Sequence, residues 1–528
     1  MSNLMTMLSY SSPDEWAARP KSDPAEKIFD LDSLAARITT VKLSGARVVH
    51  AHGVFDLLHL GHIRHLRSAK KYGDVLVVTI TEDRHVNKGP GRPAFSELHR
   101  AEQIAALEDV DYVAISRFPS AVEVITAIRP DVYIKGPDYQ VKADDVSGGI
   151  DREETAVLAV GGRLEITDDV AFSSSALLNQ YFPAFGPEVQ SYVRGLKERY
   201  TSAEILGHLA RLEELRIVVV GETILDEYTY VDQMGKSAKE PVLAMRYSRS
   251  ETYPGGALAV ANHLASFCKS IELVTYVGTS DPQENFIRRG LNTKVRPNFV
   301  YKSGSPTIVK RRYVEATLGT KLFEVYHIND APLAEREEDE LCALVDARLH
   351  NADAVVVADF GHGFLGKRSR DLLSNSGRFL AVNTQINAAN VRFHAISNYA
   401  RADYVCINES EVRLDARDRV TPLEPLVADL SKRISCDHFL VTRGSLGVEF
   451  FSPEGSFCAP SLASTVVDRM GAGDAVLAIT SACVAAKIPG DIVAFVANVV
   501  GAQKVKVVGN SSAVERVPTL KFIETLLK

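Results

Sequence analysis

Paired cysteines are missing from this sequence. None of its 6 cysteines lies before Cys268, and no two of them form a C-x-x-C pair. Such pairs mark disulfide frameworks and structural zinc sites, so neither class of protein is indicated. The first 26 residues also lack the basic-then-apolar pattern of a signal peptide, and the apolar run AVLAITSACVAA from Ala475 is too short to cross a bilayer. We expect residues 1–26 to be a loose leader and the protein to be cytoplasmic, without membrane contact.

An excess of positive charge is missing as well. The 60 Lys and Arg residues are outnumbered by 67 Asp and Glu residues, which gives a formal net charge of −7. A general nucleic-acid binder normally carries a basic stripe that neutralises phosphates, so nucleic acid is not an expected partner. A few local cations and backbone N–H groups can still hold a small polyphosphate inside an acidic protein. We therefore expect small anionic substrates.

Length and pattern indicate two α/β domains. A chain of 528 residues, 46% of them hydrophobic, is too long for one hydrophobic core. From about residue 47, short β-branched runs alternate with helical patterns, which predicts parallel strands joined by right-handed crossovers in a doubly wound sheet. A charged helical stretch follows, and a second α/β pattern then opens at RIVVVG. We predict a first domain over 27–185, a helical linker over 186–213 and a second domain over 214–528.

The run GVFDLLHLGH, residues 53–62, lies where a buried strand ends and an amphipathic helix begins. His59 and His62 are three residues apart and fall on one face of the first helical turn. A helix N-terminus attracts anions through its free N–H groups, and two imidazoles add hydrogen-bond donors. Gly53 and Gly61 have no Cβ and let a ligand approach the backbone. The run predicts a nucleotide phosphate site at the carboxyl end of the strand.

Two other interpretations of these histidines stay open at this point. A single histidine on such a helix is most often an ordinary surface or core residue. Zinc is a further alternative, although this half of the chain has no cysteine and the two histidines lack a nearby acidic ligand in the familiar spacings.

The same run resembles the cytidylyltransferase-like nucleotidyltransferases, whose H-x-G-H signature corresponds to residues 59–62. The similarity continues through VNKGPGRPAFSELHR, PDVYIKGPDY and FSSSALL, over residues 27–183. Within that superfamily it is most similar to the adenylyltransferase domain of bifunctional ADP-heptose synthesis enzymes. The resemblance implies a Rossmann-like fold, catalytic roles for His59, His62 and Lys88, and a nucleotide-binding set. That set is Gly53, Phe55, Asp56, Gly61, Arg92, Lys135, Ser173, Ser174 and Ser175.

In the reaction that this resemblance implies, a phosphate oxygen of a sugar 1-phosphate attacks the α-phosphorus of a nucleoside triphosphate, and pyrophosphate leaves. The attacking oxygen is already anionic, so the site must supply alignment and positive charge but no general base. Mg²⁺ on the leaving phosphates is expected. ATP and CTP both fit this pattern as the nucleotide.

A second glycine-rich run, DRMGAGDAVLAIT, begins at Asp468 and precedes another helix. Gly471, Ala472 and Gly473 are small, and they expose consecutive backbone N–H groups that can stabilise charge on a transferring phosphoryl group. Asp474 could take the proton of an attacking hydroxyl. An uncharged sugar hydroxyl needs such a base, unlike the phosphate nucleophile of the first domain. A G-x-G-D string by itself is often only a turn.

Runs upstream of that string resemble the PfkB/ribokinase-type carbohydrate kinases: VVVGETILDEY, PGGALAVANHLASF, INESE and VTRGSLGV. The resemblance covers residues 214–525 and leans toward the heptose kinase of the same bifunctional enzymes. It implies a ribokinase-like fold with Asp474 as the base. The residues implied for the sugar site are Asp226, Gly255, Gly256 and Asn262, and those for the substrate phosphate are Lys310 and Arg312. Asn408 and Glu411 form an N-x-x-E pair whose Glu organises Mg²⁺ indirectly, and Thr442, Gly444 and Gly447 border the nucleotide.

The alternating, strand-like segment 228–253 resembles the small β-lid that covers the sugar in these kinases and often pairs two subunits. The resemblance therefore implies a homodimer formed through the lid. Its expected small-molecule partners are a phosphosugar and a nucleoside triphosphate.

Two features depart from the family pattern. The transferase precedes the kinase, whereas the heptose enzymes have the reverse order. A D-P-K run expected after the central strand is replaced by Asn383, Thr384 and Gln385, so a carboxylate and an ammonium give way to neutral groups. One hypothesis is a bifunctional sugar-phosphate kinase and sugar-1-phosphate nucleotidyltransferase that makes an ADP-heptose-like product. The alternative is a single nucleotidyltransferase whose kinase-like domain binds sugar or dimerises; a coenzyme adenylyltransferase is a third reading, in which the kinase half would be idle.

Overall fold

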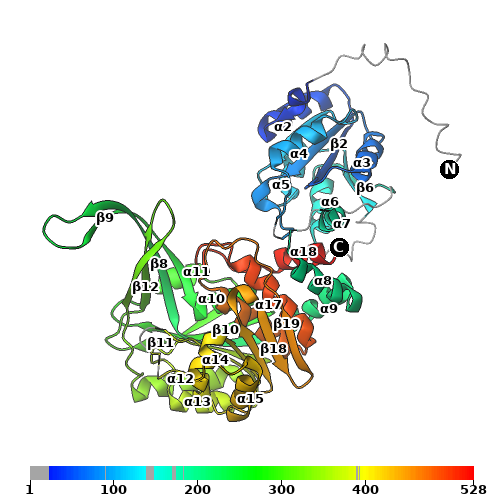
Figure 1. Cartoon of the computed structure of the whole chain (residues 1–528). Coiled ribbons are helices and arrows are strands. Elements are labelled where there is room, and N and C mark those ends of the chain that lie inside the picture. Colours follow the sequence, from blue (N-terminus) through cyan, green and yellow to red (C-terminus); the bar gives the residue numbers. More distant parts are fainter. Residues whose placement is uncertain are drawn as a thin grey trace. The chain divides into compact units, whose positions relative to one another are not determined.

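The chain divides into two compact units, Met1–Phe182 and Pro183–Lys528, in the computed structural model. Both units are α/β, with a predominantly parallel sheet between helices (Figure 1). This confirms the fold class that the alternation of strand and helix patterns predicts. The structure describes residues 23–89, 91–137, 148–168, 174–181, 184–387, 390–391 and 393–528.

The start of the described chain is part of the first unit. Residues 1–22 of the predicted leader lie outside the described residues. Pro24–Lys27 forms a short 3-10 helix, η1, and the Lys27 ammonium donates to the backbone oxygens of Leu107 (3.0 Å) and Val110 (2.8 Å). Residues 24–26, expected to be loose, are therefore helical.

Six parallel strands form the sheet of the first unit, in the order β1-β4-β3-β2-β5-β6. From β2 the chain first builds outward through β3 and β4 and then returns to the other side of β2 as β5. A sheet of this kind binds ligands at the carboxyl ends of its strands, where the strand order reverses. The strands are β1 Ile28–Phe29, β2 Val48–Gly53, β3 Val75–Thr81, β4 Tyr112–Ser116, β5 Val132–Lys135 and β6 Arg163–Ile166.

Helices cover both faces of this sheet because successive strand residues point to opposite sides. Val49 packs with Leu66 of α3 and Ile104 of α4, whereas Val48 packs with Leu34 of α2 and Ile128 of α5. The helices are α2 Leu31–Leu43, α3 Leu60–Lys70, α4 Glu97–Ala105, α5 Val122–Ile128, α6 Gly149–Ala159 and α7 Ser174–Tyr181.

The second unit contains a nine-stranded sheet in the order β11-β10-β7-β14-β15-β16-β17-β18-β19. Its strands are parallel up to β17, and β18 and β19 are antiparallel. This is the ribokinase-like fold expected from the sequence. The strands are β7 Arg216–Gly221, β10 Ser270–Gly278, β11 Val295–Lys302, β14 Ala354–Asp359, β15 Phe379–Thr384, β16 Tyr404–Asn408, β17 His438–Thr442, β18 Val448–Ser452 and β19 Gly455–Ala459.

Helices α10, α16 and α17 form much of the core of the second unit. The apolar run from Ala475 lies in α16 and is buried from Ala475 to Val484. No helix in the described part of the chain is long and apolar enough to cross a membrane. The helices of this unit are α8 Pro187–Arg199, α9 Ser202–Ala210, α10 Ala257–Ala265, α11 Glu284–Gly290, α12 Glu335–Leu349, α13 Lys367–Ser374, α14 Glu409–Ala416, α15 Leu423–Arg433, α16 Ala472–Ala485, α17 Gly490–Lys504 and α18 Arg516–Leu527.

The predicted helical linker forms α8 and α9, and both helices belong to the second unit. Tyr200 donates from its hydroxyl to the Asp491 carboxylate at the start of α17 (3.1 Å), and Arg199 pairs with the same carboxylate. Both helices also pack against α18.

A second, four-stranded sheet forms the lid of this unit, in the order β13-β12-β8-β9. The strands are β8 Thr223–Lys236, β9 Leu243–Gly256, β12 Ile308–Glu315 and β13 Lys321–His327. Figure 1 shows β8, β9 and β12 extending well beyond the main sheet. The predicted lid segment thus corresponds to β8 and β9.

Candidate active sites

The two histidines of the first unit lie together at the start of α3. His59 is the residue that caps this helix, and its Nδ1 accepts a hydrogen bond from the Gly61 N–H (3.1 Å). The His59 and His62 rings are stacked, with centroids 4.0 Å apart and planes 18° apart. On its other side, His62 meets the Phe55 ring edge-on at 5.2 Å. His59 Nε2 lies 3.1 Å from the Ser174 Oγ at the start of α7.

Both imidazoles are neutral near pH 7. Burial, followed by the charges of His59 and Lys88, lowers the pKa of His62 to about 3. Burial and the Lys88 ammonium also lower the pKa of His59. Because His59 Nδ1 accepts a hydrogen bond, its hydrogen is assigned to Nε2, which faces Ser174. This arrangement presents a neutral N–H donor at a helix start, next to a lysine.

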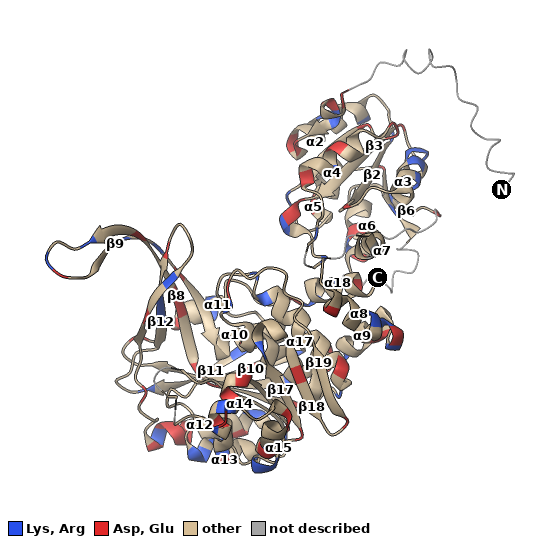
Figure 2. Cartoon of the chain, in the orientation of Figure 1, with Lys and Arg blue, Asp and Glu red and all other residues tan. Residues whose placement is uncertain are grey.

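Positive charge gathers on the helix that carries these histidines. Helix α3 contains Arg64, Arg67 and Lys70 and no acidic residue (Figure 2), although Arg67 and Lys70 lie in its last turn and pair with Asp109 and Asp111. Lys88 lies near enough to both histidines to depress their pKa values. An anionic ligand at the start of α3 would therefore meet favourable charge from the helix and from the loop that follows β3.

Asp56 shapes that loop. Its side chain is 1% exposed, and its Oδ1 accepts from the Ala94 N–H at 2.6 Å. Arg92 Nη1 lies 3.8 Å from the other carboxylate oxygen, and Arg92 Nη2 donates to Asn179 Oδ1 of α7 at 3.0 Å. Asp56 is therefore a structural anchor for the residues that the resemblance assigns to phosphates.

Lys135 is ion-paired. It ends β5, and its ammonium lies 2.8 Å from the Glu153 carboxylate of α6, which also accepts from the Tyr133 hydroxyl at 3.2 Å. An incoming phosphate would have to share Lys135 with Glu153. Of the serine triplet, Ser174 and Ser175 are buried in the first turn of α7, and Ser173 lies outside the described residues.

Arg100 is a further residue of this site that motif reasoning missed. Its side chain is fully buried on α4 and donates to the backbone oxygens of Phe95 (3.0 Å) and Thr81 (2.8 Å) and to the Asp83 carboxylate (2.6 Å). It thereby holds together the segments that follow β3 and precede α4. The signal available was an arginine on the apolar side of an amphipathic helix.

In the second unit, Gly471 precedes α16 with a φ of +74°, a left-handed conformation that favours glycine. A Cβ at this position would lie 2.3 Å from Asn510 Oδ1. Gly471 therefore allows the chain to turn sharply into the helix. The next two residues, Ala472 and Gly473, begin the helix, and Asp474 follows in its first turn.

Asp474 has the properties of a general base. Removal from bulk water raises the pKa of its carboxyl group to about 7, and the carboxylates of Asp226 and Glu411 act in the same direction. The ammonium groups of Lys504 and Lys310 oppose that shift. A base with a pKa near the working pH is the most effective at accepting a proton. The structure thus brings Asp474 near the predicted sugar residue Asp226 and phosphate residue Lys310.

Asp226 lies on the inner face of the lid and is 7% exposed. It accepts from Arg312 Nη1 at 2.6 Å and from Asn510 Nδ2 at 3.1 Å. Arg312 is also bonded to Glu324 at 2.9 Å, so two carboxylates already share this guanidinium. A Cβ on Gly255 would lie 2.2 Å from Asp226 Oδ2, which explains the glycine there.

Lys310 is the more available of the two predicted phosphate ligands. It stands opposite Asp226 in the strand register, and its ammonium lies over the rings of Tyr326 (5.4 Å) and Phe360 (5.6 Å). Burial lowers the pKa of Lys310. Among the described residues it has no hydrogen-bond or ion-pair partner. A buried cation in this state favours binding of an anionic group.

The N-x-x-E pair forms a capping box at the start of α14. Glu411 accepts from the Asn408 N–H at 2.8 Å and from the Ile386 N–H at 3.1 Å, one bond at each carboxylate oxygen. Asn408 in turn donates from Nδ2 to the Thr442 oxygen at 3.0 Å. Both Glu411 oxygens accept from backbone N–H groups. Glu411 therefore fits an indirect role in Mg²⁺ binding, through water or nucleotide phosphates. No cluster of three or more metal-binding side chains occurs in the described residues.

The remaining predicted residues have these places. Gly256 and Gly444 have positive φ angles of 57° and 59°. Gly447 also has a positive φ, and a Cβ there would lie 2.1 Å from the Ala459 oxygen. Asn262 donates to the Gly290 oxygen and accepts from the Asn292 N–H, each at 2.9 Å, so its amide ties α10 to the end of α11. Its contact with a sugar stays a prediction.

The neutral run that replaces the D-P-K pattern ends β15. Asn383 donates from Nδ2 to the Cys406 oxygen of β16 at 2.7 Å, and the Gln385 N–H donates to the Asp359 oxygen at 2.9 Å. The half-buried Asn383 side chain and the Gln385 backbone thus join β15 to the neighbouring parallel strands. The run therefore lies at the carboxyl end of a central strand, between β14 and β16, and carries no charge.

Comparisons with known proteins agree with the two predicted domain types. A cytidylyltransferase-like family model matches residues 50–177, and a model of the pfkB family of carbohydrate kinases matches residues 214–516. The order, transferase-like first and kinase-like second, is the one expected from the sequence.

Among similar proteins is the bifunctional protein HldE of Methylobacillus flagellatus, 40% identical over 164 residues, or 31% of this chain and 32% of that protein. The HldE of Geobacter metallireducens is 38% identical over 170 residues, or 32% of this chain and 33% of that protein. Each match spans about a third of the relative's own length.

Solved structures similar to this chain include a tetrameric inhibited form of phosphofructokinase-2 from Escherichia coli. It is 16% identical, with 60% of this chain and 100% of that chain covered and a TM-score of 0.49. A ribokinase from Thermotoga maritima is also 16% identical, with 58% and 99% covered and a TM-score of 0.47. Because the kinase model matches more than half of the sequence, the chain belongs to the pfkB family of carbohydrate kinases.

Proposed function

We propose that this chain is a bifunctional enzyme of nucleotide-sugar synthesis. The second unit transfers the γ-phosphoryl group of ATP to the anomeric hydroxyl of a phosphosugar of the heptose type. The first unit couples a sugar 1-phosphate to a nucleoside triphosphate and releases pyrophosphate. A separate phosphatase must remove the other phosphate between the two steps. One observation carries the proposal: a single chain has two stacked, neutral imidazoles at the start of α3 and a carboxyl group with a pKa of about 7 at the start of α16.

In the kinase step, Asp474 takes the proton of the sugar hydroxyl while the hydroxyl oxygen attacks the γ-phosphorus and ADP leaves. The backbone N–H groups at the start of α16 support the negative charge that develops on the transferring group. Lys310, a buried cation beside Asp226, binds the phosphate already on the sugar. Glu411 would help to hold Mg²⁺ with the nucleotide, where the ion would supply positive charge to the leaving phosphates.

In the transferase step, a phosphate oxygen of the sugar 1-phosphate attacks the α-phosphorus, and no proton needs to be removed. The neutral His59 and His62 rings, Lys88 and the α3 start would hold the triphosphate and stabilise the charge that develops as pyrophosphate leaves. The proposed roles of the two histidines are therefore positioning and hydrogen-bond donation, with no acid or base step.

The test is a matrix of substrates on the full chain. ATP and CTP are each combined with heptose, hexose and polyol phosphates, and ADP formation and pyrophosphate release are measured separately. We expect a phosphosugar to stimulate ADP formation and a sugar 1-phosphate to stimulate pyrophosphate release. Absence of both stimulations across the matrix would reject the proposal.

The neutral Asn383-to-Gln385 run favours a second candidate: a nucleotidyltransferase whose kinase-like unit binds sugar without phosphorylating it. In that case the substrate matrix gives pyrophosphate release and no ADP. The informative variant would then replace residues 383–385 with Asp-Pro-Lys. Only a kinase unit that is inactive in the wild-type chain can gain ADP formation from this replacement.

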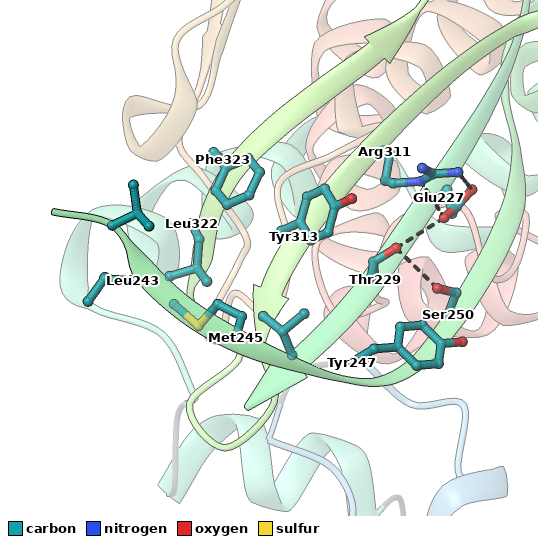
Figure 3. Close-up of a pocket in the computed structure, with 12 residues that line it drawn as sticks. Glu227, Thr229, Leu243, Met245, Tyr247, Ser250, Arg311, Tyr313, Leu322 and Phe323 are labelled. Atoms are coloured by element: carbon teal, nitrogen blue, oxygen red, sulfur yellow. Dashed lines mark hydrogen bonds and ion pairs between the residues drawn. The ribbon is translucent and has the colours of Figure 1, made fainter. Parts of the chain in front are cut away.

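We also propose that the lid pairs two copies of the chain. On its outer face lies a hollow of about 850 Å³ lined mainly by apolar and aromatic side chains (Figure 3). Leu243, Tyr247 and Phe323 are 59%, 64% and 53% exposed at this hollow. Its charged pair is already neutralised, because Arg311 bonds Glu227 at 2.6 and 3.1 Å. An exposed apolar surface of this kind suits a self-complementary twofold contact.

Phe323→Asp tests that contact. The charge would lie inside the paired surface, so we expect the wild-type chain to have twice the monomer mass by light scattering and the variant to have the monomer mass. Leu318→Asp, at an exposed position of the turn between β12 and β13, is the control. A wild-type monomer at all concentrations would rule out the dimer.

A further inference from the structure

A buried lysine lies beside the proposed base of the kinase unit. Lys504 is the last residue of α17, is 1% exposed, and donates a hydrogen bond to the Gly509 backbone oxygen. An ammonium group removed from water is unfavourable unless nearby groups compensate it. Burial lowers the pKa of Lys504, and the carboxylates of three aspartates act in the opposite direction. They are Asp474, Asp468 and Asp226.

The end of α17 also packs on the turn that starts α16. A Cβ on Gly471 would approach Lys504 Cε to 3.1 Å and Asn510 Oδ1 to 2.3 Å, so both side chains lie directly against this turn. Just before the turn, the N–H groups of residues 467–468 donate to the Val505 oxygen at 2.7 and 3.1 Å. The turn is therefore held by the residue pair 504–505.

Lys504 fixes the opposite loop as well. Its bond partner Gly509 donates from its N–H to the Asp468 carboxylate at 2.9 Å. The next residue, Asn510, donates to Asp226 at 3.1 Å. One ammonium thus connects the turn that carries the base to the loop that orients the proposed sugar ligand.

The charges around Asp474 come from several elements, and they oppose one another. Two carboxylates disfavour its ionised form, and two ammonium groups favour it. These groups are Asp226 on β8, Lys310 on β12, Glu411 on α14 and Lys504 on α17, and the Cys406 thiol of β16 also interacts with Asp474. Lys310 is the proposed ligand of a substrate phosphate. Lys504 has no proposed contact with substrate and remains beside Asp474 throughout the reaction.

We propose that Lys504 is a positioning residue for phosphoryl transfer: it fixes the Gly471 turn and the Gly509–Asn510 loop and keeps Asp474 a carboxylate. This rests on the proposed kinase function, in which Asp474 receives the hydroxyl proton. Without the ammonium, Asp226 and Asp468 keep their ion pairs with Arg312 and Lys321, whereas Asp474 loses one of the two positive charges that favour its ionised form. Asp474 then takes up a proton at a higher pH and loses its alignment.

The experiment compares Lys504→Met, which keeps the length but not the charge, with Lys504→Arg, which keeps the charge. Lys506→Met is the matched control, because this nearby lysine is partly buried and its pKa is lowered by burial alone. Phosphosugar-dependent ADP formation is measured from pH 5.5 to 9.5, with pyrophosphate release as an internal control of the other unit.

For Lys504→Met we expect kcat/KM for ADP formation to fall about 10²-fold at pH 7, the scale of a misplaced catalytic group. The acid side of its pH profile should move upward by about one pH unit, because a favourable charge is lost. Lys504→Arg should keep the wild-type profile, and Lys506→Met and all pyrophosphate release should be unchanged. A Lys504→Met enzyme with the wild-type acid side would overturn the proposal.

Two further readouts keep the proposal distinct from the kinase assignment and from folding. If the wild-type chain forms no ADP with any phosphosugar, the proposed function fails, and the positioning role is then tested by amide hydrogen exchange. Residues 468–474 and 509–510 should exchange faster in Lys504→Met than in Lys506→Met; equal exchange rejects the role. If Lys504→Met does not fold, the pH profile of Lys504→Arg is the deciding measurement. An acid side of that profile shifted to higher pH, although the positive charge is retained, also rejects the positioning role.

Discussion

The two units carry helix starts with opposite side-chain chemistry. The first places two stacked, neutral imidazoles at α3. The second places at α16 a carboxyl group whose pKa is about 7. The proposed nucleophiles explain the difference, because a phosphate oxygen is already anionic whereas a sugar hydroxyl must lose a proton. The protonation state of the side chains at each helix start thus indicates which nucleophile reacts there.

The sharpest way to break this comparison is a pair of substitutions. His62→Ala removes a ring stacked on His59, and we expect pyrophosphate release to fall about 10²–10³-fold while ADP formation persists. Asp474→Asn removes the base and should lower ADP formation about 10²–10⁴-fold while pyrophosphate release persists. Both rates are measured on each variant. If either substitution reduces both activities equally, the two sites are not independent.

Gly471→Ala should have the next largest effect. The added Cβ meets Asn510 Oδ1 at 2.3 Å in a left-handed backbone conformation, so the start of α16 must shift. A displacement of about 1 Å at a catalytic group can cost about 10²-fold in rate, and we expect a loss of that order in ADP formation.

The control for this variant is Gly207→Ala in α9, where a Cβ meets nothing within 4 Å. It should leave ADP formation unchanged and slightly raise the temperature of unfolding, because alanine is favoured over glycine in a helix interior by about 0.4–1 kcal/mol. Wild-type ADP formation by Gly471→Ala would show that the turn does not position Asp474.

The pH profiles of kcat/KM provide a smaller but direct contrast. The raised pKa of Asp474 means that ADP formation should decline as the pH falls through about 7, because the protonated carboxyl group cannot accept a proton. The lowered pKa of His62, about 3, means that its imidazole does not change charge between pH 6 and 8. Pyrophosphate release should then show no decline in that interval from this group. Profiles with the same acid side for both activities would contradict the contrast.

The smallest expected effect concerns Lys135. Glu153→Gln removes the carboxylate that holds this lysine at 2.8 Å, so the ammonium becomes freer to bind an anionic substrate. Both side chains are largely buried, and a buried ammonium without a partner gains from an incoming anion, so KM for the sugar 1-phosphate should fall. Asp151→Asn, at an exposed position of the same helix, is the control. A raised KM would mean that Glu153 itself binds substrate.

Features encoded within a few neighbouring residues could be predicted from the sequence. The alternation of buried strands and amphipathic helices predicted both sheets. The spacing of His59 and His62 predicted one helix face, and their rings are stacked. The glycine-rich approach to Asp474 likewise predicted a helix start. Each of these signals depends on local periodicity or on backbone conformation.

Partners distant in the sequence could not be predicted. Arg312 was expected to bind a substrate phosphate, yet Asp226 and Glu324 from the two neighbouring lid strands already bond its guanidinium. Glu153 and Lys504 carry no motif and become significant only through the residues that the fold brings beside them. Such pairings depend on strand order and register, which periodicity leaves undetermined.

Successive residues of the lid strands face opposite sides of the sheet and have different proposed roles. Asp226 and Arg312 face the proposed substrate, whereas the next residue before or after them, Glu227 and Arg311, lines the outer hollow. Insertion or deletion of a single residue in β8 or β12 would exchange these sets, turning the sugar ligand outward and the subunit contact inward. A single insertion or deletion would then abolish both catalysis and subunit pairing. Either face of the lid can therefore change only by substitutions that preserve the strand length.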